Sequence, residues 1–228
     1  MSKEARQQAR REAFIDAGIA VIGDVGIAET KVRALCAHAD LTERYFYESF
    51  PTLDGFARSV VEAVAFKVGL RLLEKVMPVE GDGHAKLRTV AQELVRIFSE
   101  EPGIGRILLI ETLRAGGALT EIRQNLLYGA ATLMQMWLDD SEQVDTAALV
   151  APLIMSYLSG QVPDVAATPA PDMNTVAIAG ASAELLVAWV NGRLDITAEQ
   201  LAEYVLEFID QTVAWQKNQT PSGKSHRR

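Results

Sequence analysis

Residues 41–50, LTERYFYESF, combine hydroxyl, guanidinium and aromatic side chains in one short stretch. The hydroxyls of Thr42 and Tyr47 can bind phosphate oxygens, and the ring of Tyr45 can pack against a sugar. Arg44 can donate two hydrogen bonds to the major-groove edge of a guanine. If the stretch is a helix with one exposed side, these residue types predict contacts with double-stranded DNA.

Two short helices joined by a tight turn are predicted over residues 32–38 and 43–49. Thr30 and Thr42 would cap them, because threonine is favoured at helix N-caps. A longer helix, from residue 3 to about 23, precedes them and can cover both. Three small helices in this order form a helix-turn-helix unit, in which the second short helix enters the major groove of DNA.

The second short helix is expected to have an inner and an outer side. Leu41, Phe46 and Phe50 recur near helical spacing and are expected to face the core. The side chains on the outer side, together with those at the start of the first short helix, are the candidate DNA contacts. They are Thr30, Lys31, Arg33, Thr42, Glu43, Arg44, Tyr45 and Tyr47.

The run over residues 26–50, GIAETKVRALCAHADLTERYFYESF, resembles the helix-turn-helix of TetR-family transcriptional regulators. That family has a threonine before the first short helix, an Ala-Gly-Val-Ser turn and a closing Tyr-x-x-Phe. This sequence has Thr30, the turn ADLT at 39–42 and YESF at 47–50, and the matching part is about the first quarter of the chain. The resemblance implies a homodimer that binds palindromic DNA and a C-terminal region that binds a small-molecule effector.

Two departures from the family pattern act against strong DNA binding. Asp40 replaces the turn glycine, and although aspartate tolerates left-handed backbone, it brings a negative charge close to DNA. The family's lysine at the start of the next helix is missing from residues 51–56. We therefore expect few phosphate contacts and a modest dependence of affinity on salt. Basic side chains that could compensate are Lys31, Arg33, Lys3, Arg6, Arg10 and Arg11.

Helical patterns continue through the rest of the chain, and no strand pattern persists. The predicted helices lie at 53–77, 84–100, 103–116, 119–139, 145–160, 172–191 and 197–216, with a proline-rich loop at 161–171. The fold class is therefore all-α. An N-terminal helix-turn-helix DNA-binding domain (1–52, with connecting helix 53–77) is expected to precede a larger helical ligand-binding and dimerisation domain (78–216) and a disordered tail (217–228).

Candidate residues for the effector site are polarizable or aromatic side chains, which are equally compatible with an ordinary core. They are Met134, Trp137, Met155 and Tyr157, together with Glu111 and Arg114, which can pair with each other or face a ligand. The last two predicted helices could form a four-helix bundle with a second chain, or could be buried within one chain. The candidate interface residues are Leu185, Trp189, Val205 and Phe208.

The composition limits the location and the type of partner. The net charge of −8 disfavours binding to DNA by overall charge alone. The single cysteine, Cys36, allows no internal disulfide and fits a reducing compartment. The charged N-terminus lacks the apolar segment of a secretion signal, and the stretch VAIAGASAELLVAWV is short of a membrane span. We expect a cytoplasmic location and no membrane partner.

Motifs of enzymes are absent from the sequence: we find no nucleophile elbow, phosphate loop or zinc-type spacing of cysteine and histidine. No catalytic residue, metal or cofactor is expected. The favoured hypothesis is a repressor that binds a palindromic operator as a homodimer and responds to an unidentified small molecule. One alternative is a regulator-like helical dimer that has lost strong DNA binding and acts through protein interaction. The other is an enzyme on a helical bundle, which would need a pocket with convergent titratable groups.

Overall fold

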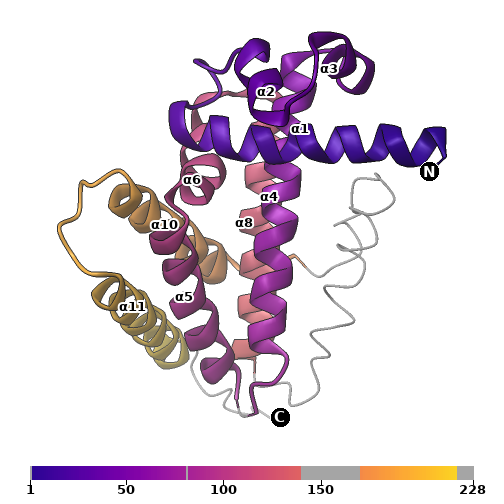
Figure 1. The fold of residues 1–228 in the computed structure, drawn as a ribbon. Coiled ribbons are helices and arrows are strands. Elements are labelled where there is room, and N and C mark those ends of the chain that lie inside the picture. The colour runs from indigo at the N-terminus through magenta and orange to yellow at the C-terminus, as the bar shows by residue number, and fades with distance from the viewer. Residues whose placement is uncertain (1, 81, 140–169, 220–228) are drawn as a thin grey trace.

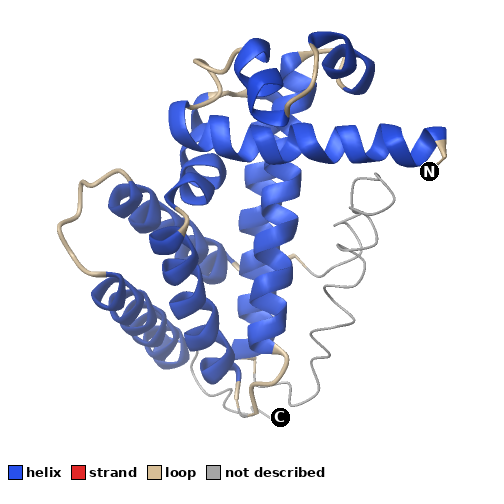
Figure 2. Cartoon of the chain, viewed as in Figure 1, coloured by secondary structure: helices blue, strands red, loops and turns tan. Residues whose placement is uncertain are grey.

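The computed structural model describes residues 2–80, 82–139 and 170–219, and every regular element within them is a helix (Figures 1 and 2). The predicted all-α fold class is confirmed. The predicted helix at 145–160 and the loop at 161–171, up to residue 169, lie outside the described residues.

The N-terminal unit consists of α1 (Lys3–Val25), α2 (Val32–Ala39) and α3 (Glu43–Ser49). Figure 1 shows α2 and α3 together on one side of α1, at one end of the molecule. Phe46 and Phe50 point into the core as predicted, where both are at most 2% exposed. The ring of Phe46 lies 5.3 Å from that of Phe14 and 5.2 Å from that of Phe56, in edge-to-face contacts that hold α3 onto α1 and α4.

The turn between α2 and α3 depends on Asp40, which has φ 52° and ψ 42°. This left-handed conformation, predicted for the residue that replaces the family's glycine, ends α2. The prediction that Thr30 caps α2 is wrong. Lys31 occupies the N-cap without a side-chain bond, while the Thr30 hydroxyl donates a 2.7 Å hydrogen bond to the Gly26 carbonyl and so closes the preceding loop. Thr42 does occupy the N-cap of α3, but its side chain makes no capping hydrogen bond.

The long helix α4 (Leu53–Val76) runs from this unit along the rest of the molecule (Figure 1). It packs against α5 (Gly83–Glu100), which in turn packs against α8 (Gly117–Leu138) and α11 (Ala198–Gln219). One hydrophobic core begins in the N-terminal unit, follows α4 and reaches Ile97, Ile107 and Leu119. The N-terminal unit therefore shares its core with the helices that follow it.

A second core lies between α5, α8, α11 and α10 (Met173–Val190). Helix α10 contains the stretch VAIAGASAELLVAWV, which was predicted to be too short for a membrane span. The helix has a mean hydropathy of 1.4 over 18 residues, so by length and composition alone it is long and apolar enough to cross a membrane, and 28% of these residues are fully buried in the chain. It packs against α8 and α11, and most of its other residues are half-buried.

The segment predicted as one helix over 103–116 is divided into α6 (Pro102–Gly105), a π-helical turn η1 (Arg106–Glu111) and α7 (Thr112–Arg114). Hydrogen bonds in a π-helix join residues five apart, so Arg106 and Glu111 come onto the same side of the turn. A Cβ atom on Gly23 of α1 would lie 3.0 Å from the Gly103 Cα, because the backbones of α1 and α6 touch there.

The remaining helix ends follow the sequence signals closely. Gly192, with φ 68°, follows the C-cap of α10, where glycine readily adopts the left-handed conformation. Helix α11 begins with a capping box, in which Thr197 N donates to Gln200 Oε1 at 2.9 Å and Gln200 N to Thr197 Oγ1 at 3.3 Å. Helix α11 continues to Gln219, so the predicted tail does not begin at 217, and residues 220–228 lie outside the described part.

Candidate DNA-binding surface

Five side chains of α3 and its N-cap are exposed, and we call them the α3 outer face. They are Thr42, Glu43, Arg44, Tyr47 and Glu48. The Tyr47 side chain is 55% exposed although its ring touches the buried Phe46, with ring centroids 5.4 Å apart. Because the Tyr47 ring packs against Phe46, its hydroxyl is held away from the core at a fixed position. Such a hydroxyl suits a contact to a phosphate oxygen.

Arg44 and Glu48 form an ion pair one helical turn apart on this face. Arg44 Nε donates to Glu48 Oε1 at 2.9 Å, and the two side chains are 83% and 45% exposed. This hydrogen bond and the charge of Glu48 raise the pKa of the Arg44 guanidinium. The hydrogen bonds of the described chain use only the Nε group of Arg44, which leaves its two terminal amino groups open.

Arg10 of α1 joins the same surface. Its guanidinium carbon lies 3.8 Å above the centre of the Tyr45 ring, and its Nη1 lies 3.9 Å from Glu48 Oε2. Tyr45, expected to face outward, is instead half-buried: its ring packs against the core and Arg10 covers it. Sequence reasoning placed Arg10 only in a basic run and left Glu48 out of the contact list. The i, i+4 spacing of Arg44 and Glu48 is the signal that could have found the pair.

The N-terminal unit has two further exposed cations at the start of α2: Lys31 at its N-cap and Arg33 in its first turn. Thr30, predicted as a DNA contact, is only 5% exposed and its hydroxyl is used within the loop. The prediction of a DNA contact by Thr30 therefore does not fit its position.

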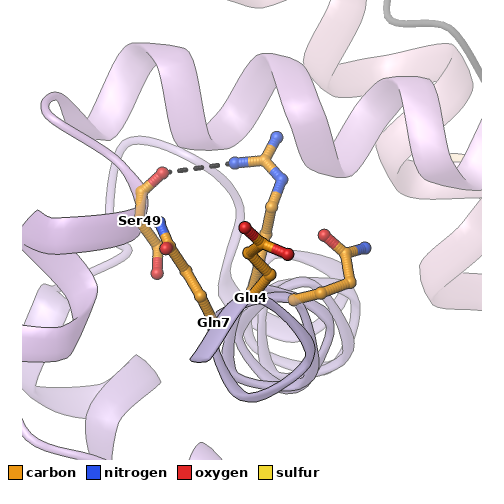
Figure 3. A pocket seen from close by; sticks show the side chains of 5 residues that line it. Glu4, Gln7 and Ser49 are labelled. Carbon is orange, nitrogen blue, oxygen red and sulfur yellow. Dashed lines mark hydrogen bonds between the residues drawn. The ribbon is translucent and has the colours of Figure 1, made fainter. Parts of the chain in front are cut away.

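Arg11, from the same basic run, holds the unit together. Its Nη1 donates to the Ser49 carbonyl at 3.2 Å and its Nη2 to Ser59 Oγ at 3.1 Å, while its guanidinium lies over the Phe50 ring. Figure 3 shows the Arg11 bond at the edge of a small open hollow of about 230 Å³, lined also by Glu4, Gln7 and Gln8. Because two of its donors are used within the unit and its guanidinium is stacked on the Phe50 ring, Arg11 supports α3 and the start of α4.

The candidate effector residues that the structure describes line neither the hollow in Figure 3 nor a second one beside His84. Met134 and Trp137 are buried in the second core, packed against other helices, while Met155 and Tyr157 lie outside the described residues. A second hollow, also open to solvent, is lined by His84, Asp210, Val213 and Ala214. The described residues contain no cluster of side chains that could hold a metal ion.

Glu111 and Arg114, the other two candidates, lie where the N-terminal unit meets the rest of the chain. Glu111 is 4% exposed, and its Oε2 accepts a 2.8 Å hydrogen bond from the backbone N–H of Ile27, in the loop before α2. Its Oε1 lies 3.5 Å from Arg106 Nε and 3.9 Å from Arg114 Nη1. Arg106 Nη1 also donates to the Asp24 carbonyl at 2.7 Å. Glu111 and Arg106 therefore fasten the end of α1 and the following loop to η1.

The candidate interface residues lie mostly inside the single chain. Val205 is 9% exposed, and Leu185, Trp189 and Phe208 are half-buried against the second core. Trp189 Nε1 donates to the Ile196 carbonyl at 3.0 Å. The buried position of Val205 makes it unsuitable for contact with a second chain.

Helix α11 nevertheless has a second apolar stripe on its outer side. Tyr204 and Trp215 are 57% and 59% exposed. Together with Phe208 and Gln211 they recur at i, i+4, i+7 and i+11, which places them on one side of the helix. We call Tyr204, Phe208, Gln211 and Trp215 the α11 outer stripe.

Comparison with known proteins gives a consistent answer for the fold. No protein-family model and no curated protein sequence matches this chain. Among solved structures, a TetR-family transcriptional regulator from Streptomyces coelicolor matches with a TM-score of 0.65 at 16% identity, over 96% of this chain and 86% of that one. FadR of Bacillus subtilis, solved in complex with stearoyl-CoA, matches with a TM-score of 0.63 at 16% identity, over 87% and 96%.

A third match, AibR, was solved with isovaleryl coenzyme A and operator DNA, and has a TM-score of 0.55 at 12% identity, over 87% of this chain and 97% of that one. In each case the match extends over nearly all of both chains and is not confined to the N-terminal unit. The chain thus has the fold of TetR-like transcriptional regulators, with an N-terminal helix-turn-helix followed by a helical region.

Proposed function

We propose that this protein is a DNA-binding transcriptional regulator in which α3 enters the major groove. The observation that carries the proposal is the α3 outer face: exposed Arg44 and Tyr47 stand on a short helix whose inner side is fixed by a cluster of phenylalanines. Rigid support of this kind is needed for side chains that must meet base edges and phosphates in register. Lys31 and Arg33 lie exposed on the neighbouring α2, where they can meet backbone phosphates.

A second copy of the chain is the partner that this function requires, since two recognition helices about 34–36 Å apart would meet successive major grooves. Two features support a homodimer built on α10 and α11. Helix α10 is apolar and most of its residues are only half-buried, with Met173 84% exposed, and the α11 outer stripe exposes Tyr204 and Trp215. Large exposed apolar surface of this kind marks interaction sites.

A small molecule would regulate such a dimer by favouring the form whose helix spacing does not fit DNA. We propose acyl-coenzyme A thioesters as the first effector class to test, because FadR and AibR were solved with members of this class. Thermal denaturation of the protein in the presence of thioesters of increasing acyl-chain length shows whether the protein binds these compounds. A rise in melting temperature that depends on chain length would support the assignment, and no shift with any thioester would refute it.

The test of DNA binding is selection of bound duplexes from a random pool at low and moderate salt. Recovery of a palindromic site is expected. On that site, Arg44→Ala should lower affinity about tenfold or more and relax one base position, since a bidentate arginine pair carries that much discrimination. Tyr47→Phe should weaken binding to all sequences alike, as loss of a phosphate contact does.

The same surface also motivates a second candidate function. Asp40, Glu43 and Glu48 bring three carboxylates to the side that would face DNA, while Arg11 is engaged within the unit. A helical dimer that has lost DNA binding and acts on another protein would show this charge pattern. If the selection recovers no duplex even at low salt, this second function replaces the first.

A further inference from the structure

We propose that Glu48 is a positioning residue that holds Arg44 in the orientation that reads a guanine, and that it gives the protein sequence specificity at the cost of general affinity for DNA. The proposal rests on the DNA-binding function proposed above. Glu48 would normally be regarded as unfavourable on a DNA-binding surface, because its negative charge repels phosphates.

The geometry of the pair leaves Arg44 ready for a base. A guanidinium has five N–H donors, and Arg44 gives the one on Nε to Glu48 Oε1 at 2.9 Å. The donors on the two terminal nitrogens remain, and two of them suffice for the parallel hydrogen bonds to O6 and N7 of guanine. An arginine that is already held loses less rotamer freedom on binding than one that moves freely in solvent.

The Glu48 carboxylate is itself held from the other side. Its Oε2 lies 3.9 Å from Arg10 Nη1, and the Arg10 guanidinium is stacked on the Tyr45 ring, which packs against the core. A chain of contacts therefore leads from the core of the unit through Tyr45, Arg10 and Glu48 to Arg44. Preorganisation of a binding group by such supporting contacts is what narrow specificity needs.

Helix stability does not account for the pair. An arginine followed four residues later by a glutamate is the less stabilising of the two orders on a helix, and a carboxylate in the last turn of α3 opposes the helix dipole. Glu48 lies in that last turn, since α3 ends at Ser49. The charge of Glu48 is unfavourable both for its helix and for affinity to DNA. Its presence is explained if it lowers binding to wrong sequences.

The chain offers a matched control on α4. Arg58 Nε donates to Glu62 Oε1 at 2.8 Å, again with i, i+4 spacing and in the same order, and the two side chains are 37% and 38% exposed. This pair is the same in chemistry but is not part of the α3 outer face. Glu62→Ala therefore removes an equal charge from the protein without touching Arg44.

The experiment measures affinity for the wild-type selected duplex, for duplexes changed at each base pair, and for a random duplex. In Glu48→Ala, discrimination at the base pair read by Arg44 should fall about tenfold, while affinity for the random duplex should rise. Glu48→Gln keeps an acceptor for the Arg44 Nε–H and should recover part of the discrimination. Glu62→Ala should leave discrimination at every base pair unchanged.

The double variant Arg44→Ala/Glu48→Ala distinguishes a positioning role from a direct one. If Glu48 acts through Arg44, the double variant discriminates no worse than Arg44→Ala alone, because the effects of coupled residues do not add. If Glu48 instead accepts a hydrogen bond from a cytosine itself, the two single variants lose preference at different base pairs and their effects add, which would overturn the proposal. Unchanged discrimination in Glu48→Ala would overturn it as well.

Failure of the underlying function has a different signature. If the wild-type protein selects no duplex, the DNA-binding function is overturned together with this proposal. If the wild-type protein selects a site and Glu48→Ala keeps its discrimination, only the role of Glu48 is overturned. Circular dichroism and thermal denaturation of each variant establish that α3 is still folded.

Discussion

Substitution of Glu111 by alanine tests whether the carboxylate of η1 holds the N-terminal unit in place. The substitution removes the acceptor that lies 2.8 Å from the Ile27 N–H, and it removes the partner of Arg106 at 3.5 Å. The Glu111 side chain is 5% exposed, so water does not simply replace it. Arg106 keeps its hydrogen bond to the Asp24 carbonyl.

The expected loss in free energy of unfolding follows from these contacts. A hydrogen bond to a charged group contributes about 1.5–3 kcal/mol, and a donor left unpaired and partly buried adds to the loss. The Arg106 side chain is 32% exposed, so its ion pair with Glu111 adds less than about 1 kcal/mol. We expect a total of roughly 2–4 kcal/mol, which lowers the melting temperature of a chain of this size by on the order of 5–10 °C.

Thermal and urea denaturation at one fixed protein concentration measure the effect, since a dimer's stability depends on concentration. Glu111→Gln keeps an acceptor oxygen for the Ile27 N–H and should lose less. Arg114→Ala, which removes a 65% exposed side chain 3.9 Å from the same carboxylate, should change stability by no more than about 0.5 kcal/mol. The reasoning is refuted if Glu111→Ala is as stable as Arg114→Ala.

Three further predictions concern the N-terminal unit and the helix that connects it. A Cβ atom on Gly18 would lie 2.5 Å from an α4 side chain, so Gly18→Ala should lower the free energy of unfolding in urea by about 1–3 kcal/mol. A Cβ atom on Gly69 would point into open space, so Gly69→Ala should raise the free energy of unfolding by up to about 1 kcal/mol, and equal changes in the two variants would contradict this. Asp40→Gly is compatible with the left-handed turn at φ 52° and removes a negative charge, so the affinity for DNA should rise in gel shifts at low salt. An unchanged affinity would place Asp40 away from the duplex. Burial, and secondarily the charge of Glu43, raise the pKa of the Cys36 thiol. An aromatic disulfide reagent at pH 8 should therefore react slowly with Cys36 in the folded protein and fast in denaturant, and a fast reaction of the folded protein would refute the buried position.

The N-terminal unit could be predicted from the sequence because its signals are local. Phe46 and Phe50 fall four residues apart, Thr42 and Pro51 bracket α3, and Asp40 stands at the turn, so the bounds of α3 were predicted correctly. Each of these signals depends on neighbours within a few residues. Local preferences and the hydrophobic pattern therefore agree, which is the condition under which a sequence specifies its helices.

The contacts of the candidate site could not be predicted in the same way, because they join distant parts of the chain. Arg10 reaches Tyr45 and Glu48 only after α1 has crossed α3, and Glu111 meets Ile27 across 84 positions of sequence. The π-helical turn that brings Arg106 and Glu111 together has no recognised sequence signal, so one uninterrupted helix was predicted there. The contacts of Arg10 and Glu111 and the π-helical turn therefore depend on tertiary packing and not on local sequence.

The backbone contact between Gly23 and Gly103 has a consequence for protein engineering. Neither position accommodates a side chain without displacing the other helix, since a Cβ on either glycine would lie 3.0–3.2 Å from the opposite Cα. The N-terminal unit of this chain is therefore not structurally independent of the helices that follow it. A chimera that joins residues 1–52 to the C-terminal helices of another protein with this fold will keep α2 and α3 in place only if the recipient supplies a glycine where Gly103 stands and an acceptor where Glu111 stands.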